Sequence, residues 1–194
     1  MLVAGFAAGP LRSNCYLLAR VSGGPCLVVD PGEGAAEPLA AALAEHELTP
    51  AALLATHGHP DHVGGAAEAT RRYGVPLRLH PADAEGYAGP WEPLAEGPLT
   101  VAGLTVGVLP LPGHTPGSVA FTVETGEGGR LVLTGDTLFA GSIGRARGSG
   151  ADLERSLRTL LTLAGDTVVL PGHGPATTIE RERAGNPHLP GAVR

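Results

Sequence analysis

Lysine and glutamine are missing from this chain of 194 residues, and all 13 of its basic residues are arginine. Without a lysine amine, the protein cannot form a Schiff base with a substrate or use a lysine as a general base. The only cysteines, Cys15 and Cys26, lie in apolar stretches and lack the spacing of a CxxC or Cys/His site. We therefore expect two buried free thiols, and chemistry that depends on neither lysine nor cysteine.

Long apolar runs, basic clusters and aromatic residues are also scarce. No run of about 18 apolar residues is present that could span a bilayer, and residues 1–6 lack the basic start of a signal peptide. The net charge is −6 and aromatic residues make up 4% of the chain, a balance that argues against nucleic acid as a partner. We expect a soluble, cytoplasmic protein with a single domain over residues 1–194 and no membrane partner. Its oligomeric state is not indicated.

The first half of the chain has the pattern of a β-α-β unit. Short β-type runs at residues 2–6, 14–21 and 26–29 precede a helical pattern at 35–47 and a buried strand at 51–55. A second helix is expected at residues 64–73, where Arg71 and Arg72 suit the negative end of the helix dipole and Gly74 can cap it. A cluster of histidines therefore lies between the end of a strand and the start of a helix.

Strands and helices alternate in the second half as well. After a strand at residues 76–79, a Gly/Pro-rich surface loop is expected at 86–98. The expected elements that follow are strands at residues 99–109, 118–123, 130–133 and 167–170, and an amphipathic helix at 152–164. The fold class indicated is α/β, with two mixed sheets packed together and helices outside them.

The strongest chemical signal is the segment Thr56-His57-Gly58-His59-Pro60-Asp61-His62. Imidazole and carboxylate ligands suit zinc, iron or manganese better than calcium, which prefers oxygen ligands. In extended backbone, residues i and i+2 point to the same side, so His57 and His59 can bind one metal. Asp61 and His62 follow Pro60, where the chain turns into a helix, and this change of direction suggests a second ion.

Three further segments each place one histidine or aspartate in a Gly/Pro turn after an apolar run, and they contribute His114, Asp136 and His173. The seven residues divide into one set of His57, His59 and His114 and another of Asp61, His62 and His173, with Asp136 able to bridge both. Such sets leave an open position for water, as catalytic sites require. We expect two divalent metal ions, zinc first, with iron or manganese as alternatives. His46, His80 and His188 have no ligand spacing and are not expected in the site.

This pattern resembles the metallo-β-lactamase superfamily, in its glyoxalase II-like branch of hydroxyacylglutathione hydrolases. The resemblance is carried by Asp30 in Val-Val-Asp-Pro-Gly, the His-x-His-x-Asp-His motif, His114, Asp136 and His173, in the order of the family. It implies an αβ/βα four-layer sandwich with the metals at one edge of the two sheets. It also implies that Asp30 orients the site without binding metal, whereas an Asx turn before Pro31 is the structural alternative.

The function that the resemblance implies is thioester hydrolysis, in which metal-bound hydroxide attacks an S-hydroxyacyl thiol such as S-lactoylglutathione and Asp61 orients the nucleophile. Arg145 is a candidate to bind an anionic substrate group, with surface solvation as the competing interpretation. Glyoxalase II enzymes carry a C-terminal helical extension that holds glutathione, but only residues 174–194 follow His173 here. The thiol carrier therefore stays open.

Other functions remain compatible with these residues. Persulfide dioxygenases of the same superfamily bind one iron and retain these positions. Hydrolysis of a β-lactam, or of a lactone or another ester, could also use the same site. Nuclease activity is disfavoured by the acidic net charge. A metal-binding module without activity is the non-enzymatic alternative.

Overall fold

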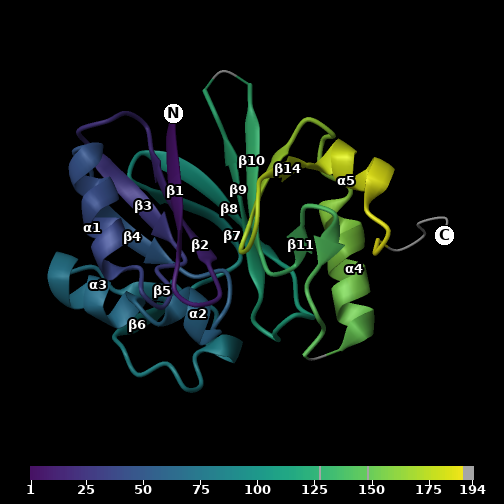
Figure 1. The fold of residues 1–194 in the computed structure, drawn as a ribbon, viewed down its shortest axis with the longest axis horizontal. Helices are drawn as coiled ribbons and strands as arrows, with labels where there is room; N and C mark the ends of the chain where they lie inside the picture. Colours follow the sequence, from purple (N-terminus) through teal and green to yellow (C-terminus); the bar gives the residue numbers. More distant parts are fainter. Residues whose placement is uncertain (127, 148, 190–194) are drawn as a thin grey trace.

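Two six-stranded sheets form the centre of the computed structural model, which describes residues 1–126, 128–147 and 149–189 (Figure 1). The first sheet has the strand order β1-β2-β3-β4-β5-β6 and comes from the first half of the chain. Its strands are β1 (Leu2–Ala8), β2 (Ser13–Ala19), β3 (Pro25–Val29), β4 (Thr49–Leu54), β5 (Leu77–Leu79) and β6 (Trp91–Pro93). The helices of this half are α1 (Ala36–Glu45), α2 (Pro60–Val63), α3 (Ala66–Tyr73) and the 3-10 helix η1 (Pro81–Asp83).

The second sheet has the order β14-β13-β10-β9-β8-β7. Its strands are β7 (Gly97–Val101), β8 (Leu104–Pro110), β9 (Val119–Glu124), β10 (Arg130–Gly135), β13 (Val168–Pro171) and β14 (Thr177–Thr178). A small hairpin, β11 (Leu138–Phe139) and β12 (Ser142–Ile143), follows β10, and the helices are α4 (Gly150–Leu160) and α5 (Ile179–Gly185). Both sheets are mixed, since β3 to β6 run parallel and β10 is parallel to β13, whereas the other neighbouring strands are antiparallel.

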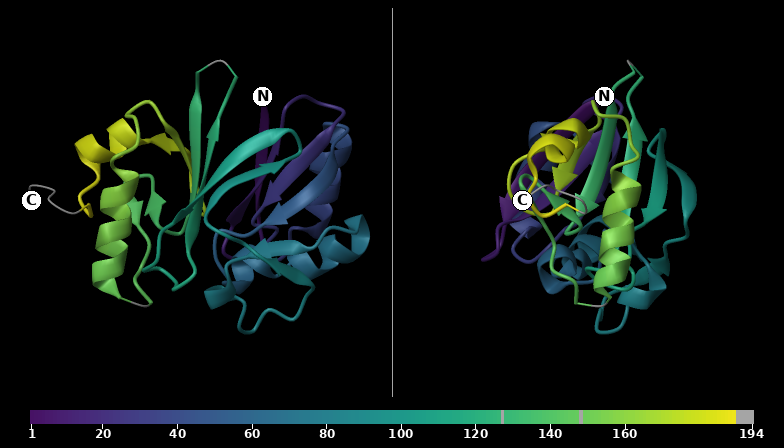
Figure 2. Two further views of the ribbon diagram at one scale, coloured as in Figure 1. Left: turned by 180° about the vertical axis from the view of Figure 1, so that it is seen from behind. Right: turned by 90° about the vertical axis from the view of Figure 1, so that its right-hand side faces the viewer.

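The alternation of side chains along the central strands explains the four layers. In β3, Leu27 and Val29 pack into the apolar cluster between the sheets, while Cys26 and Val28 pack on the other face into the cluster beneath α1 and α3. A strand buried on both faces reads as a continuous apolar run. A third cluster lies under α4 and α5. Figure 2 shows the helices α1 and α3 on one outer side and α4 and α5 on the other, which confirms the expected αβ/βα sandwich.

Several element boundaries differ from the sequence-based expectation. The run expected at residues 99–109 is a hairpin, β7–β8, that turns at Ala102 and Gly103, both with positive φ (53° and 69°). The segment 86–98, expected as a surface loop, contributes the edge strand β6 and the start of β7. The short strands β11, β12 and β14 and the helix α5 were not expected. In the part of the chain that the structure describes, no helix has the length and apolar character needed to cross a bilayer.

Candidate metal centre

Seven side chains from five segments meet where strands of both sheets end. His57 and His59 follow β4, and Asp61 and His62 belong to the first turn of α2, which Pro60 begins. The other three follow β8, β10 and β13, and they are His114, Asp136 and His173. Among the described residues, the groups whose ligand atoms lie within 4.8 Å of one another are His57/His59/His114, His57/His62/Asp136 and Asp61/His62/His173. The structure thus brings together all seven residues that the sequence singled out.

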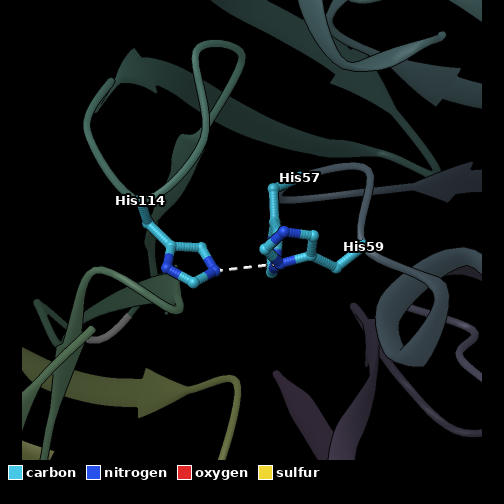
Figure 3. Close-up of side chains that lie close together, drawn as sticks. All are labelled: His57, His59 and His114. Carbon is cyan, nitrogen blue, oxygen red and sulfur yellow. Dashed lines mark hydrogen bonds between the residues drawn. The ribbon is translucent and has the colours of Figure 1, made fainter. Parts of the chain in front are cut away.

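The first group consists of three imidazoles from opposite sides of the centre (Figure 3). The Nδ1 atom of His59 lies 3.0 Å from His57 Nε2 and 3.0 Å from His114 Nε2. Nitrogen ligands about 2.0–2.1 Å from a tetrahedral zinc ion would stand about 3.3 Å apart. These two distances are therefore close to the edge of a metal coordination tetrahedron.

The second group, as the name is used from here on, is Asp61, His62 and His173, and it combines one carboxylate with two imidazoles. Asp61 Oδ2 lies 3.2 Å from His173 Nε2 and 3.4 Å from His62 Nε2. Asp136 lies between the two groups, because its Oδ1 is 3.3 Å from His62 Nε2 while its Oδ2 is 3.5 Å from both His114 Nε2 and His173 Nε2. This position is the one expected of a carboxylate that contacts two ions.

Two atoms at the centre of the site are buried without a hydrogen-bond partner. They are His62 Nε2 and Asp136 Oδ1. A buried polar atom that lacks a partner costs roughly 1–3 kcal/mol, so native proteins rarely keep one that nothing satisfies. An imidazole lone pair and a carboxylate oxygen are both good ligands for a divalent ion. The donor set and these two atoms are consistent with a binuclear metal site.

Hydrogen bonds at the outer nitrogen fix the tautomer of four histidines. Nδ1 of His62 donates to Asp30 (3.0 Å), Nδ1 of His114 donates to the Arg145 carbonyl (2.8 Å), and Nδ1 of His173 donates to the Leu11 carbonyl (3.2 Å). Nδ1 of His57 lies 3.1 Å from the Thr56 hydroxyl, which itself donates to Asp30 (2.7 Å) and therefore accepts from the ring. In a neutral imidazole the other nitrogen, Nε2, then carries the lone pair. All four lone pairs belong to Nε2 atoms of the groups described above.

Asp30 acts on the site through these bonds. It is 2% exposed, and its carboxylate accepts from the Thr56 amide (2.7 Å), the Thr56 hydroxyl and His62. The hydrogen bonds of this side chain therefore connect it to β4 and α2 and do not form an Asx turn with Pro31 and Gly32. Its backbone has a φ of 55°, a conformation that Asp and Asn adopt more readily than most residues.

The charges of the site are set by its own members. Burial disfavours the charged form of Asp61, but the nearby imidazoles of His173 and His62 outweigh burial and hold the pKa of that carboxyl well below its usual range. The same two histidines lower the pKa of Asp136 against the effect of its burial. Hydrogen bonds to Asp136 and Asp61 raise the pKa of His173 to about 9, so in the metal-free site its Nε2 carries a proton that a bound ion would replace. Both carboxylates are therefore charged at neutral pH and attract a cation.

Arg145 approaches the centre through its backbone. Its carbonyl holds His114, while its side chain is exposed. Arg147 is also exposed, and its amide donates to the His114 carbonyl (3.2 Å). Burial, then His114 and then the charge of Arg147 lower the pKa of His59. Binding of substrate by Arg145 stays a prediction. His46, His80 and His188 belong to none of the groups.

Ser13 was not predicted to be a site residue, yet it contacts the site. Its hydroxyl donates to Asp61 Oδ2 (2.9 Å), and the next side chain, Asn14, donates to the carbonyls of Pro171 and Gly174 (2.9 Å each) on both sides of His173. The start of β2 thereby supports the second group. A serine followed by an asparagine at a strand start gives no such signal, because these partners are distant in sequence.

Comparisons with known proteins agree on the family. The model of the metallo-beta-lactamase superfamily matches residues 8–173. An uncharacterized protein of Mycobacterium tuberculosis is 43% identical, with 100% of both chains covered. The probable metallo-hydrolase YqgX of Bacillus subtilis is 37% identical over 94% of this chain and 95% of its own. Hydroxyacylglutathione hydrolase GloC of Haemophilus influenzae is 36% identical over 84% of this chain and 86% of its own.

Solved structures agree with the sequence comparison. The B3 metallo-beta-lactamase BLEG-1 superposes with a TM-score of 0.87 at 33% identity, covering 98% of this chain and 100% of its own. The di-iron-bound form of TTHA1623 has a TM-score of 0.80 at 38% identity, covering 96% and 100%. Three findings point to the same family. They are the fold, the grouped histidines and aspartates, and the family match from residue 8 to residue 173. The chain therefore belongs to the metallo-β-lactamase superfamily.

Proposed function

We propose that this metal-dependent hydrolase cleaves thioesters of the S-hydroxyacyl type, such as S-lactoylglutathione. The observation that carries the proposal is the set of four histidines whose Nδ1–H groups are held by protein oxygens, so that their Nε2 atoms are left to bind metal beside two charged carboxylates. The hydroxyacylglutathione hydrolase of Haemophilus influenzae, 36% identical to this chain, supports the choice of thioester.

The two metal ions would be held by separate ligand sets. His57, His59 and His114 would bind one ion, Asp61, His62 and His173 the other, and Asp136 would contact both. Two bound ions would supply Lewis acidity for the substrate carbonyl and lower the pKa of a water molecule toward neutrality.

Asp61 is the residue that we assign to orienting the water. Its carboxylate stays charged and is held by the Ser13 hydroxyl on one side and by His173 on the other. A fixed, charged acceptor can take a hydrogen bond from the attacking water and aim its lone pair at the carbonyl carbon. The leaving thiol has a pKa of about 8.5 and can depart as a thiolate. A thiolate needs no general acid to protonate it. This agrees with the Tyr16 hydroxyl, which donates its proton to the Pro171 carbonyl (2.8 Å).

The arginines beside His114 favour a substrate whose thiol part carries an anionic group. Arg145 and Arg147 are exposed and lie on a segment that hydrogen-bonds to His114 through its backbone. A guanidinium group binds a carboxylate with two parallel hydrogen bonds. We therefore propose that Arg145 holds a carboxylate of the thiol part of the substrate.

The test is thiol release from S-lactoylglutathione by protein loaded with zinc or with iron. The double variant His59→Ala/Asp61→Ala serves as the blank, and we expect release by the wild type alone. In addition, Arg145→Ala should raise KM for this substrate several-fold and leave KM for an uncharged thioester unchanged, with the exposed Arg155→Ala as the matched control. Loaded protein that leaves the thioester intact, but consumes oxygen with a persulfide or opens a lactone or a β-lactam, would overturn the proposal.

A further inference from the structure

A second buried carboxylate, Asp83, lies behind the first group of histidines. It ends the 3-10 helix η1 after β5, and it is 8% exposed. None of the groups that could hold a metal includes it. A buried carboxylate is costly unless it is hydrogen-bonded, so its partners indicate why it is there.

The first partner is the loop that follows β4. The Gly58 amide donates to Asp83 Oδ2 (2.9 Å), and Gly58 is the residue between His57 and His59. A side chain at position 58 would overlap the Asp83 carbonyl oxygen, so glycine permits this approach. The carboxylate thus holds the backbone unit that joins two of the three histidines.

The other partners belong to the loop that follows β8. The Thr115 hydroxyl donates to Asp83 Oδ2 (2.5 Å) and the Gly117 amide donates to Oδ1 (2.7 Å). Thr115 is the neighbour of His114, and Ser118 braces it by accepting from the Thr115 amide (3.0 Å). The same carboxylate therefore fixes the loop that carries the third histidine.

These bonds join the two sheets at the metal centre. His57 and His59 follow a strand of the first sheet, whereas His114 follows a strand of the second, and Figure 3 shows the two loops approaching from opposite sides. We propose that Asp83 is a positioning residue that sets the separation of these loops, and through it the spacing of the three nitrogens. The proposal rests on the metal centre described above. The hydrogen bonds of Asp83 do not involve Asp61, His62 or His173.

This arrangement predicts an effect on one ion only. In Asp83→Asn, the amide group cannot accept from every donor that the carboxylate now serves, so at least one of the two backbone amides, Gly58 or Gly117, loses its acceptor. Loss of such supporting partners typically weakens metal binding about 10- to 100-fold. We expect that loss of affinity for the ion bound by the first group, and an unchanged affinity for the ion bound by the second group.

The experiment is a titration of metal-free protein with cobalt(II), whose visible absorption reports ligand geometry, followed by competition with zinc and by thermal melting of the metal-free protein. Glu182→Gln is the matched control, because Glu182 is 3% exposed and also accepts three hydrogen bonds, from Thr177, Gly141 and Asn186. Glu182→Gln should lower the melting temperature and leave the affinity for both metal ions unchanged. Thr115→Val removes one hydrogen bond of Asp83 and should weaken binding of the ion at the first group less than Asp83→Asn does. Thr115→Ser keeps the hydroxyl and should keep wild-type affinity.

The outcomes separate the two proposals. Wild-type protein that binds no metal contradicts the proposed centre itself. If the wild type binds two metal ions and Asp83→Asn binds both as tightly, the positioning role is wrong. It is also wrong if Asp83→Asn binds both ions more weakly to the same extent and has a lowered melting temperature, because a general loss of structure would have that effect. If Asp83→Asn does not fold, the comparison of Thr115→Val with Thr115→Ser decides, and equal binding by these two variants overturns the role.

Discussion

The substitution Asp30→Asn tests whether the protein orients His62 as the hydrogen bonds indicate. Asn has the shape of Asp and tolerates the positive φ of this position, so the change isolates the hydrogen bonds from backbone strain. At present one carboxylate oxygen accepts from the Thr56 amide, and the other accepts from the Thr56 hydroxyl and from Nδ1 of His62.

Either orientation of the new amide is unfavourable. If its NH2 group faces the Thr56 amide, two donors meet and a buried donor is left without a partner, which costs about 1–3 kcal/mol. If the NH2 group faces His62, Nδ1 must accept, and the ring proton moves to Nε2, the atom that would bind metal. We therefore expect the free energy of unfolding to fall by about 1–3 kcal/mol and the affinity for one metal equivalent to fall about 10- to 100-fold.

Urea unfolding of the metal-free protein measures the first effect, and a metal titration measures the second. Asp166→Asn is the control, because Asp166 pairs with Arg130 at the surface with its side chain 68% exposed, and exposed pairs contribute about 0–1 kcal/mol. Wild-type stability together with wild-type metal affinity in Asp30→Asn would refute the assignment of His62 to a tautomer fixed by Asp30.

Three further predictions concern the centre and the core. Gly172→Ala would place a methyl group 2.7 Å from His62 Cε1 and against Asp136 Oδ1. We therefore expect metal affinity to fall at least about 10-fold in a calorimetric titration. Gly185→Ala, whose methyl group meets nothing within 4 Å, should leave the affinity unchanged. Removing metal that was present at about 1,000 times its Kd should cost about 4 kcal/mol and lower the melting temperature by roughly 8–16 °C in a calorimetric scan; an unchanged melting temperature would contradict a stabilising centre. Burial raises the pKa of Cys26 to about 11 and that of Cys15 well above its usual value, so neither thiol should react with a thiol reagent at pH 8 until the protein unfolds, and rapid modification of the native protein would show that they are accessible.

The elements with a clear period were predictable from the sequence. The β-type run at residues 26–29 indicated the strand β3, and β4, ending at the histidine cluster, was expected as a buried strand within two residues of its bounds. The hairpin β7–β8 was missed because Ala102 and Gly103 interrupt an otherwise continuous β pattern without an Asn-Gly or Asp-Gly turn. The edge strand β6 was missed because its Trp-Glu-Pro sequence is short and exposed, and its formation depends on pairing with β5.

Candidate ligands and their supporting residues differ in how far they can be read from sequence. A histidine or aspartate in a Gly/Pro turn after a strand carries its own local signal, and His57 to His62 carry several together. Asp83, in contrast, bonds to Gly58, 25 positions before it, and to Thr115 and Gly117, 32 and 34 positions after it. Two of the three donors are backbone amides, and the glycine that the approach requires at position 58 is common in loops, so no residue type at the far end marks the contact. Only the folding of two separate sheets against each other makes Pro-Ala-Asp a structural part of the centre. Residues that hold a site together across two sheets are therefore the ones that sequence patterns miss, and substitutions such as Asp83→Asn measure them directly.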